Sequence, residues 1–297
     1  MLLASSYATD TLKKYKGGWN TLVNFMYDEK IKWSFPIPNN VIEALICHLH
    51  QEKSSYSKIQ STVTSIAFFH KVNDHPDPSK TFRITRIMRA LKAKTTFKPK
   101  LLPLRFETLK NLIDICQSYS ETTHLTLLPA VLLFTYHGCF RIGEVVKSND
   151  LRHTLHMKDI SFTESEGREE VRITLPTYKH SSEPATLTIP ASRDKYCPVR
   201  YLHNYLQVRG NQPGPIFLMP NGSPVNRAFI ASRLKELLII SGKNPALYNT
   251  HSLRIGRASD LAARGTPDHL IRHTGRWSTE AYLGYIRFAD FKTPPAV

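Results

Sequence analysis

The chain has 297 residues, of which 41% are apolar, and it carries 40 lysines and arginines against 24 aspartates and glutamates. This length and apolar content allow two domains with real cores and exclude a wholly disordered chain, and no apolar run approaches the about 20 residues that a membrane-spanning helix needs. A formal charge of +16 and a pI near 9.7 favour a nucleic-acid partner over a protein that is merely basic and soluble.

Two further features concern the compartment. The cysteines, which lie at Cys47, Cys116, Cys139 and Cys197, show neither metal-binding nor disulfide spacing, so we expect ordinary thiols in a reducing environment. The first ten residues, MLLASSYATD, lack the basic region of a signal peptide, so none is expected.

Residues 1–97 predict a helical domain. Apolar residues recur there at helical spacing in four stretches, interrupted by FPIP at 35–38 and by a loop at 73–79. The four stripes are Trp19, Leu22, Phe25 and Met26; Val41, Leu45, Ile46 and Leu49; Ile59, Val63, Ile66 and Phe69; and Ile84, Ile87, Met88 and Leu91.

A basic segment overlaps the last stripe. Nine basic residues and no acidic one lie from Lys80 to Arg105, whereas a solvated surface usually mixes both signs. Three arginines recur at i, i+3 and i+6 without a counter-charge, which favours a helix face turned to phosphates over an ordinary solvated face. Residues 98–105 predict a basic linker between two domains. The candidate DNA-binding residues are Arg83, Arg86, Arg89, Lys92, Lys94, Lys98 and Lys100.

Residues 106–297 predict a second domain that combines helices with a small antiparallel sheet. Alternating apolar residues at 171–175 and 187–189 indicate a β-hairpin with its tip near 177–184. The fold class expected is therefore mainly α with a small antiparallel β-hairpin, in two domains. Helices are expected at Phe106–Ser118, Leu125–Tyr136, Tyr201–Arg209, Arg227–Ser241, Ser252–Ala263 and Asp268–His273.

The stretch GRWSTEAYLGYIR, residues 275–287, predicts one more short helix, opened by Ser278. Tyr282 and Tyr285 are three residues apart, so both rings would leave the same side of that helix.

Four segments offer side chains with catalytic potential. GCFRIGE places Arg141 just after a helix that ends in glycine, TYKHSS places Lys179 at the hairpin tip, and HSLRIGR places His251 and Arg254 on one helix face. The fourth segment holds Trp277 ahead of the two tyrosines. Taken singly, each group also has an ordinary explanation: an ion pair with Glu144, a solvated lysine, a helix cap or a core aromatic ring.

The combination resembles the tyrosine recombinase (phage integrase) family. The order Arg, hairpin Lys, His-x-x-Arg, Gly-x-Trp and Tyr-Ile-Arg carries the resemblance, and GRWSTEAYLGYIR is similar to the variant in DIRS-type and crypton-type mobile elements. The resemblance spans nearly the whole chain, with 1–97 similar to the helical core-binding (SAM-like) domain and 106–297 to the catalytic domain.

The resemblance implies a site-specific DNA recombinase or integrase that cleaves and rejoins strands through a covalent 3′-phosphotyrosine, without metal, ATP or another cofactor. It implies double-stranded DNA as the partner, bound by a dimer on one site and a homotetramer on two paired sites. It also implies a nuclear location for a eukaryotic mobile element and the cytoplasm or nucleoid otherwise.

The residue types fit the chemistry of a phosphodiester. Two fork-shaped guanidinium groups, those of Arg141 and Arg254, can clamp its non-bridging oxygens and neutralise the charge that develops there. His251 can donate to the phosphate or manage the proton of the nucleophile, and Lys179 can protonate the departing 5′ oxygen. Trp277 stands where the family carries His or Trp, and its indole N–H can still donate a hydrogen bond.

The nucleophile that the resemblance implies is a tyrosine, and a phenol with a pKa near ~10 suits this role because it ionises more easily than a serine hydroxyl. Tyr285 lies in the family-like YIR, eight residues after Trp277, where nine is commoner in bacterial members. Tyr282, at five, is the alternative.

Two other functions remain open at the level of the sequence. One is a captured mobile-element protein that keeps the fold as a DNA-binding factor without strand exchange. The other is a type IB topoisomerase-like enzyme, which a plasmid-relaxation assay without paired sites separates from a recombinase.

Overall fold

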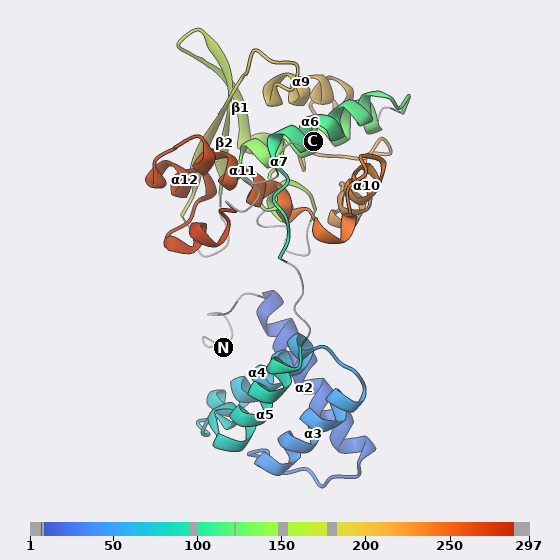
Figure 1. Ribbon diagram of the computed structural model, residues 1–297, viewed down its shortest axis with the longest axis vertical. Coiled ribbons are helices and arrows are strands. Elements are labelled where there is room, and N and C mark those ends of the chain that lie inside the picture. Colours follow the sequence, from blue (N-terminus) through green and yellow to red (C-terminus); the bar gives the residue numbers. More distant parts are fainter. Residues whose placement is uncertain are drawn as a thin grey trace, which may run out of the picture. The chain divides into compact units, whose positions relative to one another are not determined.

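The computed structural model describes residues 7, 9–95, 100–121, 123–147, 154–176 and 183–287. The chain divides into two compact units, Met1–Lys98 and Pro99–Val297. The described part is mainly helical and contains one three-stranded antiparallel sheet, which confirms the predicted fold class (Figure 1). Within the described residues, no helix is both long and apolar enough to cross a bilayer.

Unit 1 is built from helices whose apolar stripes meet in one core. Its elements are α2 (Thr9–Asp28), α3 (Asn39–Gln51), α4 (Tyr56–Val72), the 3-10 helix η1 (Pro78–Lys80) and α5 (Phe82–Ala93). All four predicted stripes contribute residues to this core, which confirms the helices predicted from their spacing. A buried histidine fixes the FPIP segment that separates α2 from α3. The Ile37 N–H donates to Nε2 of His70 (3.1 Å), and Nδ1 of the same ring lies 2.8 Å from the Ile66 carbonyl oxygen.

The arginine row lies on the exposed side of α5, opposite the buried Ile84. The expectation that no counter-charge accompanies it was wrong for one member. Arg83 forms an ion pair of 2.7 Å with Glu43, which reaches it from α3. Packing of two helices brings these charges together, and the sequence of α5 alone contains no sign of it.

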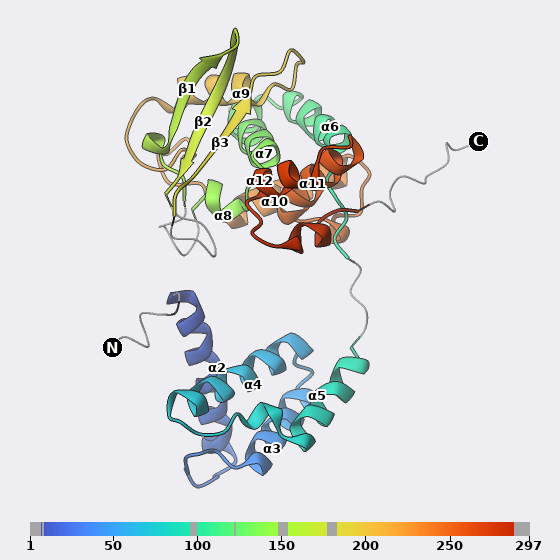
Figure 2. The ribbon, with the colours of Figure 1, turned by 90° about the vertical axis from the view of Figure 1, so that its left-hand side faces the viewer.

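Unit 2 is built around α7, whose side chains are buried on nearly every side. In Figure 2 the strands lie on one side of α7, and α11 lies on another. The helices are α6 (Phe106–Gln117), a π-helix (Thr123–Leu127), α7 (Leu128–His137), α8 (Ile142–Val145), a 3-10 turn (Met157–Asp159), α9 (Pro198–Arg209), α10 (Arg227–Ile240), a 3-10 turn (Pro245–Leu247), α11 (His251–Ala263), α12 (Asp268–Gly275) and the 3-10 helix η6 (Glu280–Gly284). A helix that is apolar all round belongs in the centre of a domain, which explains the position of α7.

The sheet has the order β1 (Ile160–Ser165), β2 (Arg168–Leu175) and β3 (Ala185–Pro190). The predicted hairpin is β2–β3, in register at Val171↔Ile189 and Ile173↔Leu187. The predicted tip lies largely outside the described residues.

Strand β1 was not predicted. A two-residue turn, Glu166-Gly167, joins it to β2, and both of its residues have positive φ (52° and 71°). This is the backbone of a tight hairpin turn that matches strand twist.

Residues 102–105 of the predicted linker lie against α11 and the 3-10 turn that precedes it. The N–H groups of Leu102 and Leu104 donate to the carbonyl oxygens of Leu247 (2.8 Å) and Ser252 (2.9 Å). Gly256 permits this close approach, because a Cβ there would lie 1.9 Å from the Leu104 carbonyl oxygen. The segment entering unit 2 therefore helps to fix the helix that begins with His251.

Candidate active site

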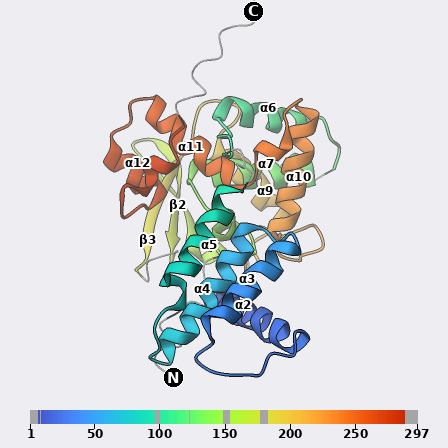
Figure 3. The same ribbon diagram turned by 60° about the horizontal axis from the view of Figure 1, so that its bottom comes forward.

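Three segments that are far apart in the sequence meet at one end of unit 2. They are the turn after α7, helix α11, and the stretch from the end of α12 through η6. Helix α12 lies beside α11 (Figures 1 and 3). A small apolar cluster holds the three segments together; its buried members are Cys139, Ala258, Ile271, Trp277 and Tyr282.

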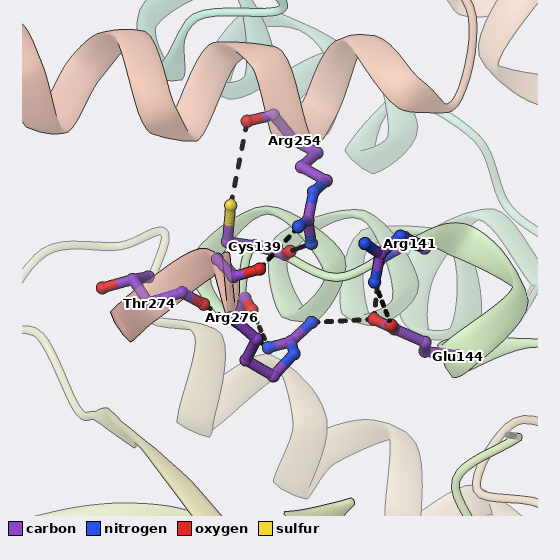
Figure 4. Close-up of polar contacts among 8 residues, drawn as sticks. Cys139, Arg141, Glu144, Arg254, Thr274 and Arg276 are labelled. Atoms are coloured by element: carbon purple, nitrogen blue, oxygen red, sulfur yellow. Dashed lines mark hydrogen bonds and ion pairs between the residues drawn. The ribbon is translucent and has the colours of Figure 1, made fainter. Parts of the chain in front are cut away.

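Arg254 connects the three segments. It projects from α11, is fully buried, and donates through Nη1 to the Cys139 carbonyl oxygen and through Nη2 to that of Gly275 (2.5 Å; Figure 4). Its guanidinium carbon lies 4.4 Å from the centre of the Trp277 ring and 5.5 Å from that of Tyr285. The carbonyl oxygens at its edge and the aromatic rings over its face stabilise the buried charge of this guanidinium and hold it in place.

His251 lies next to the same tyrosine, at the first position of α11. The ring centres of His251 and Tyr285 are 5.2 Å apart. Burial, then the positive charges of Arg254 and Arg141, lower the pKa of His251 to about 4. The imidazole is therefore neutral at neutral pH and has a nitrogen that can accept a proton.

The lowered pKa of His251 predicts a pH dependence of stability. The unfolded chain takes up this proton near the ordinary pKa of 6.5 and the folded chain only near 4, so between these values the unfolded state binds more protons. We expect the free energy of unfolding to fall as the pH is lowered from 6.5 to 4. Urea unfolding at pH 7.5 and 5 should show a smaller difference for His251→Gln than for the wild type. An unchanged difference would contradict this account.

Trp277 contributes an unpaired donor. Its side chain is buried, the centre of its ring lies 4.8 Å from that of Tyr285, and its buried Nε1 has no hydrogen-bond partner within the described residues. The ring occupies the space beside Gly275, where a Cβ would lie 1.8 Å from a ring atom. A buried N–H without an acceptor is costly, so this donor suits a site that an external acceptor fills.

The two tyrosines differ in their surroundings. The helix expected to begin at Ser278 is instead the 3-10 helix η6, whose cap is Thr279, with a side chain that accepts from the Ala281 N–H (3.3 Å). In a 3-10 helix, residues i and i+3 lie directly in line, which keeps both rings on the Trp277 side. Tyr282 is buried, and a hydrogen bond to the Asp268 carboxylate raises its pKa.

Tyr285 is only partly buried. Ser259 on α11 anchors the backbone of residues 285–287. Its hydroxyl donates to the Tyr285 carbonyl oxygen (3.2 Å) and accepts from the Arg287 N–H (3.0 Å). Tyr285 therefore faces His251 and Arg254 while its backbone is fixed to α11.

Arg141 belongs to a second polar group, centred on Glu144. Arg141 pairs with Glu144 through Nη1 (3.0 Å), and its backbone N–H donates to the same carboxylate (2.9 Å). The ion pair weighed as an ordinary explanation is thus present. Glu144 also pairs with Arg276 (2.8 Å), a residue that the sequence analysis missed (Figure 4). Arg276 is the middle residue of the Gly-x-Trp motif, and this position was the sequence feature that could have indicated its role.

Lys179 and Lys98 lie outside the described residues. Arg86, Arg89, Lys92 and Lys94 are exposed in unit 1, and Lys100 is exposed in unit 2. A pocket of about 470 Å³ that was not predicted lies between α2 and α4, and Lys14 and Lys58 line it together with several hydroxyl groups. The hydroxyl-rich run SSYSKIQST was a signal for such a surface. In the part of the chain that the structure describes, no cluster of three or more His, Cys, Asp or Glu side chains could hold a metal ion.

No protein-family model matches this chain, and no curated protein matches it. Several solved structures do. A lambda integrase dimer bound to a COC′ core site is similar over 100% of this chain and 77% of that one, with a TM-score of 0.63 and 14% identity. The XerH site-specific recombinase bound to palindromic difH substrate, a post-cleavage complex, is similar over 94% and 77%, with a TM-score of 0.64 and 12% identity. The Tn1549 transposon integrase in complex with circular intermediate DNA is similar over 86% and 82%, with a TM-score of 0.57 and 15% identity. The fold of this chain is that of the tyrosine recombinases.

Proposed function

We propose that this protein is a site-specific DNA recombinase that cleaves and rejoins strands with Tyr285 as its nucleophile. The observation that carries the proposal is the meeting of Tyr285 with His251, Trp277 and Arg254. The similar solved structures include recombinases and integrases bound to DNA, which supports DNA as the partner. The narrower relation to DIRS-type or crypton-type elements rests on GRWSTEAYLGYIR alone.

The proposed cleavage step is a displacement at phosphorus. The Tyr285 oxygen forms a bond to phosphorus while the bond to the 5′ oxygen breaks, which leaves a 3′-phosphotyrosine and a 5′-hydroxyl. The phenolic proton passes to neutral His251, and the 5′ oxygen takes up a proton, for which Lys179 is the proposed donor. Rejoining is the reverse step, in which a 5′-hydroxyl attacks and expels the tyrosine. The phosphotyrosine conserves the energy of the phosphodiester.

The guanidinium groups and the indole would stabilise the charge on the non-bridging oxygens. Arg254 is fully buried beneath the rings of Trp277 and Tyr285, so the scissile phosphate reaches it only after those rings shift.

The proposal is tested by capture of the covalent adduct. A pool of duplexes with a randomised central sequence, each nicked next to the candidate scissile phosphate, loses the short 5′-hydroxyl strand after cleavage and traps the adduct. We expect wild-type protein in EDTA to give a protein–DNA adduct that survives denaturation and is enriched in one sequence family. Binding without an adduct would favour a DNA-binding factor, and relaxation of plasmids lacking the enriched site would favour a topoisomerase-like enzyme.

In this proposal, unit 1 is the helical DNA-binding domain of an assembly with a dimer on each site and a homotetramer on two. The exposed row on α5 supplies its phosphate contacts. For a chain from a eukaryotic mobile element, the assembly would form in the nucleus.

The salt dependence of DNA binding tests the role of α5. Each phosphate contact contributes about −0.9 to the slope of log K against log salt concentration. We expect the double variant Arg86→Ala/Arg89→Ala to reduce the slope by roughly 1.8. Arg83→Ala is the matched control, with a smaller expected effect because Glu43 already offsets that charge. If the slope of Arg86→Ala/Arg89→Ala equals that of the wild type while the slope of Lys14→Ala/Lys58→Ala is reduced, the phosphate contacts are made by the pocket between α2 and α4 and not by α5.

A further inference from the structure

We infer that Arg276 is a positioning residue that sets both the direction and the effective charge of Arg141 through their shared partner Glu144. The inference rests on the proposed function, because Arg141 is one of the two arginines proposed to clamp the scissile phosphate. The contacts of the three side chains are drawn in Figure 4.

The first observation is that Arg276 is directed inward. It follows α12 in a left-handed backbone conformation (φ 54°, ψ 45°), which is uncommon for a residue other than glycine. Through Nη1 it donates to the carbonyl oxygens of Gly138 (3.2 Å) and Thr274 (3.4 Å), and its guanidinium lies 5.1 Å from the Phe140 ring centre. The left-handed turn sends Arg276 toward Glu144, whereas the next residue, Trp277, packs on Tyr285.

The second observation is that Glu144 is shared by two arginines with different exposure. One carboxylate oxygen accepts from Arg141 Nη1, and the other accepts from the Arg141 backbone N–H and from Arg276 Nη2. The side chain of Arg276 is 4% exposed and that of Arg141 is 25% exposed. Arg141 can therefore meet a phosphate from outside, while Arg276 serves an internal partner.

The third observation concerns charge. Burial opposes ionisation of Glu144, but Arg276 and then Arg141 hold the pKa of its carboxyl below the ordinary value, so Glu144 is an anion. Paired with Arg141 alone, this anion would cancel the charge that the phosphate needs. With Arg276 present the group has two positive charges and one negative charge, so Arg141 retains a net positive field. Glu144 also anchors Arg141 at two points, which restricts the direction of its guanidinium.

The test compares Arg276→Met with Arg141→Ala and with the double variant, using single-turnover cleavage of the nicked duplex. We expect Arg276→Met to slow cleavage by up to about 100-fold, the loss that a small misplacement of a reacting group can produce. In the Arg141→Ala background the same change should cost less than about threefold, because the two residues act as one unit. Arg276→Lys should recover part of the rate, since it keeps the charge. Arg272→Met, at the end of α12, removes a side chain that donates to the Ser278 carbonyl oxygen (3.2 Å) and should cleave normally.

A purely structural role for Arg276 predicts a different result. The losses would then multiply in the double variant, and that result, or a wild-type rate in Arg276→Met, would overturn the inference.

A methylphosphonate at the scissile position separates this inference from the proposed function. A neutral methylphosphonate gains less from a positive field than a charged phosphate does. Because Arg276→Met weakens this field, the difference in DNA affinity between phosphate and methylphosphonate duplexes should be smaller for this variant than for the wild type. This binding result does not depend on whether wild-type protein forms an adduct. An unchanged difference would overturn the inference independently of cleavage.

Discussion

Replacing Tyr285 by phenylalanine should abolish the covalent adduct on the nicked duplex. The variant keeps the ring that packs on His251 and Trp277 and loses only the oxygen that would bond to phosphorus. Removing a nucleophile typically costs at least about 10⁴-fold in rate, so no adduct should form on the timescale of the wild-type reaction. Denaturing gel electrophoresis measures the adduct, and a filter-binding assay on the same preparation should give a nearly unchanged DNA affinity.

Tyr282→Phe is the matched control for this experiment. It removes the hydroxyl that contacts Asp268 and retains the buried ring, so cleavage should stay within a few-fold of the wild type. Mass spectrometry of the trapped wild-type adduct provides an independent assignment. If mass spectrometry finds the DNA attached to Tyr282, or if the Tyr285→Phe variant still forms an adduct, Tyr285 is not the nucleophile.

Arg254→Lys should reduce the single-turnover cleavage rate by about 10²–10³-fold, the loss typical of removing one preorganised donor from a charged transition state. Lysine preserves the charge but has no planar fork, so it cannot hold the carbonyl oxygens of Cys139 and Gly275 and also face a phosphate. The effect should fall on the cleavage rate at saturating protein, with a smaller change in DNA affinity.

The matched control is Arg257→Lys, which lies one turn further along α11. Its guanidinium carbon lies 5.7 Å from the ring centre of Tyr136. Thermal unfolding of both variants identifies any general loss of structure, since Arg254 is buried and its replacement also disturbs packing. A folded Arg254→Lys protein that cleaves within threefold of the wild type would contradict the proposed role.

The helices of unit 1 could be predicted because each carries a long stripe with a period near 3.6, and the apolar residues of these stripes did meet in one core. The β2–β3 hairpin could be predicted from its period of two. Strand β1 was missed because its alternation is short and its turn depends on positive φ at Glu166 as well as at Gly167. The start of the last helix was misplaced because Ser278 and Thr279 are both residue types that cap helices, and in the structure Thr279 is the cap.

By itself, the sequence determined the fold class, the order of the candidate residues and the chemistry that those residue types allow. These properties follow from local periodicity and from the functional groups of individual side chains. Tertiary structure alone decided that Arg254 lies beneath Tyr285 and Trp277, that Glu43 offsets one arginine of the α5 row, and that Arg276 points to Glu144 while its neighbour points to the tyrosine. Such relations depend on contacts between residues that are distant along the chain, and on a backbone turn stable only within the folded unit, so no local pattern encodes them.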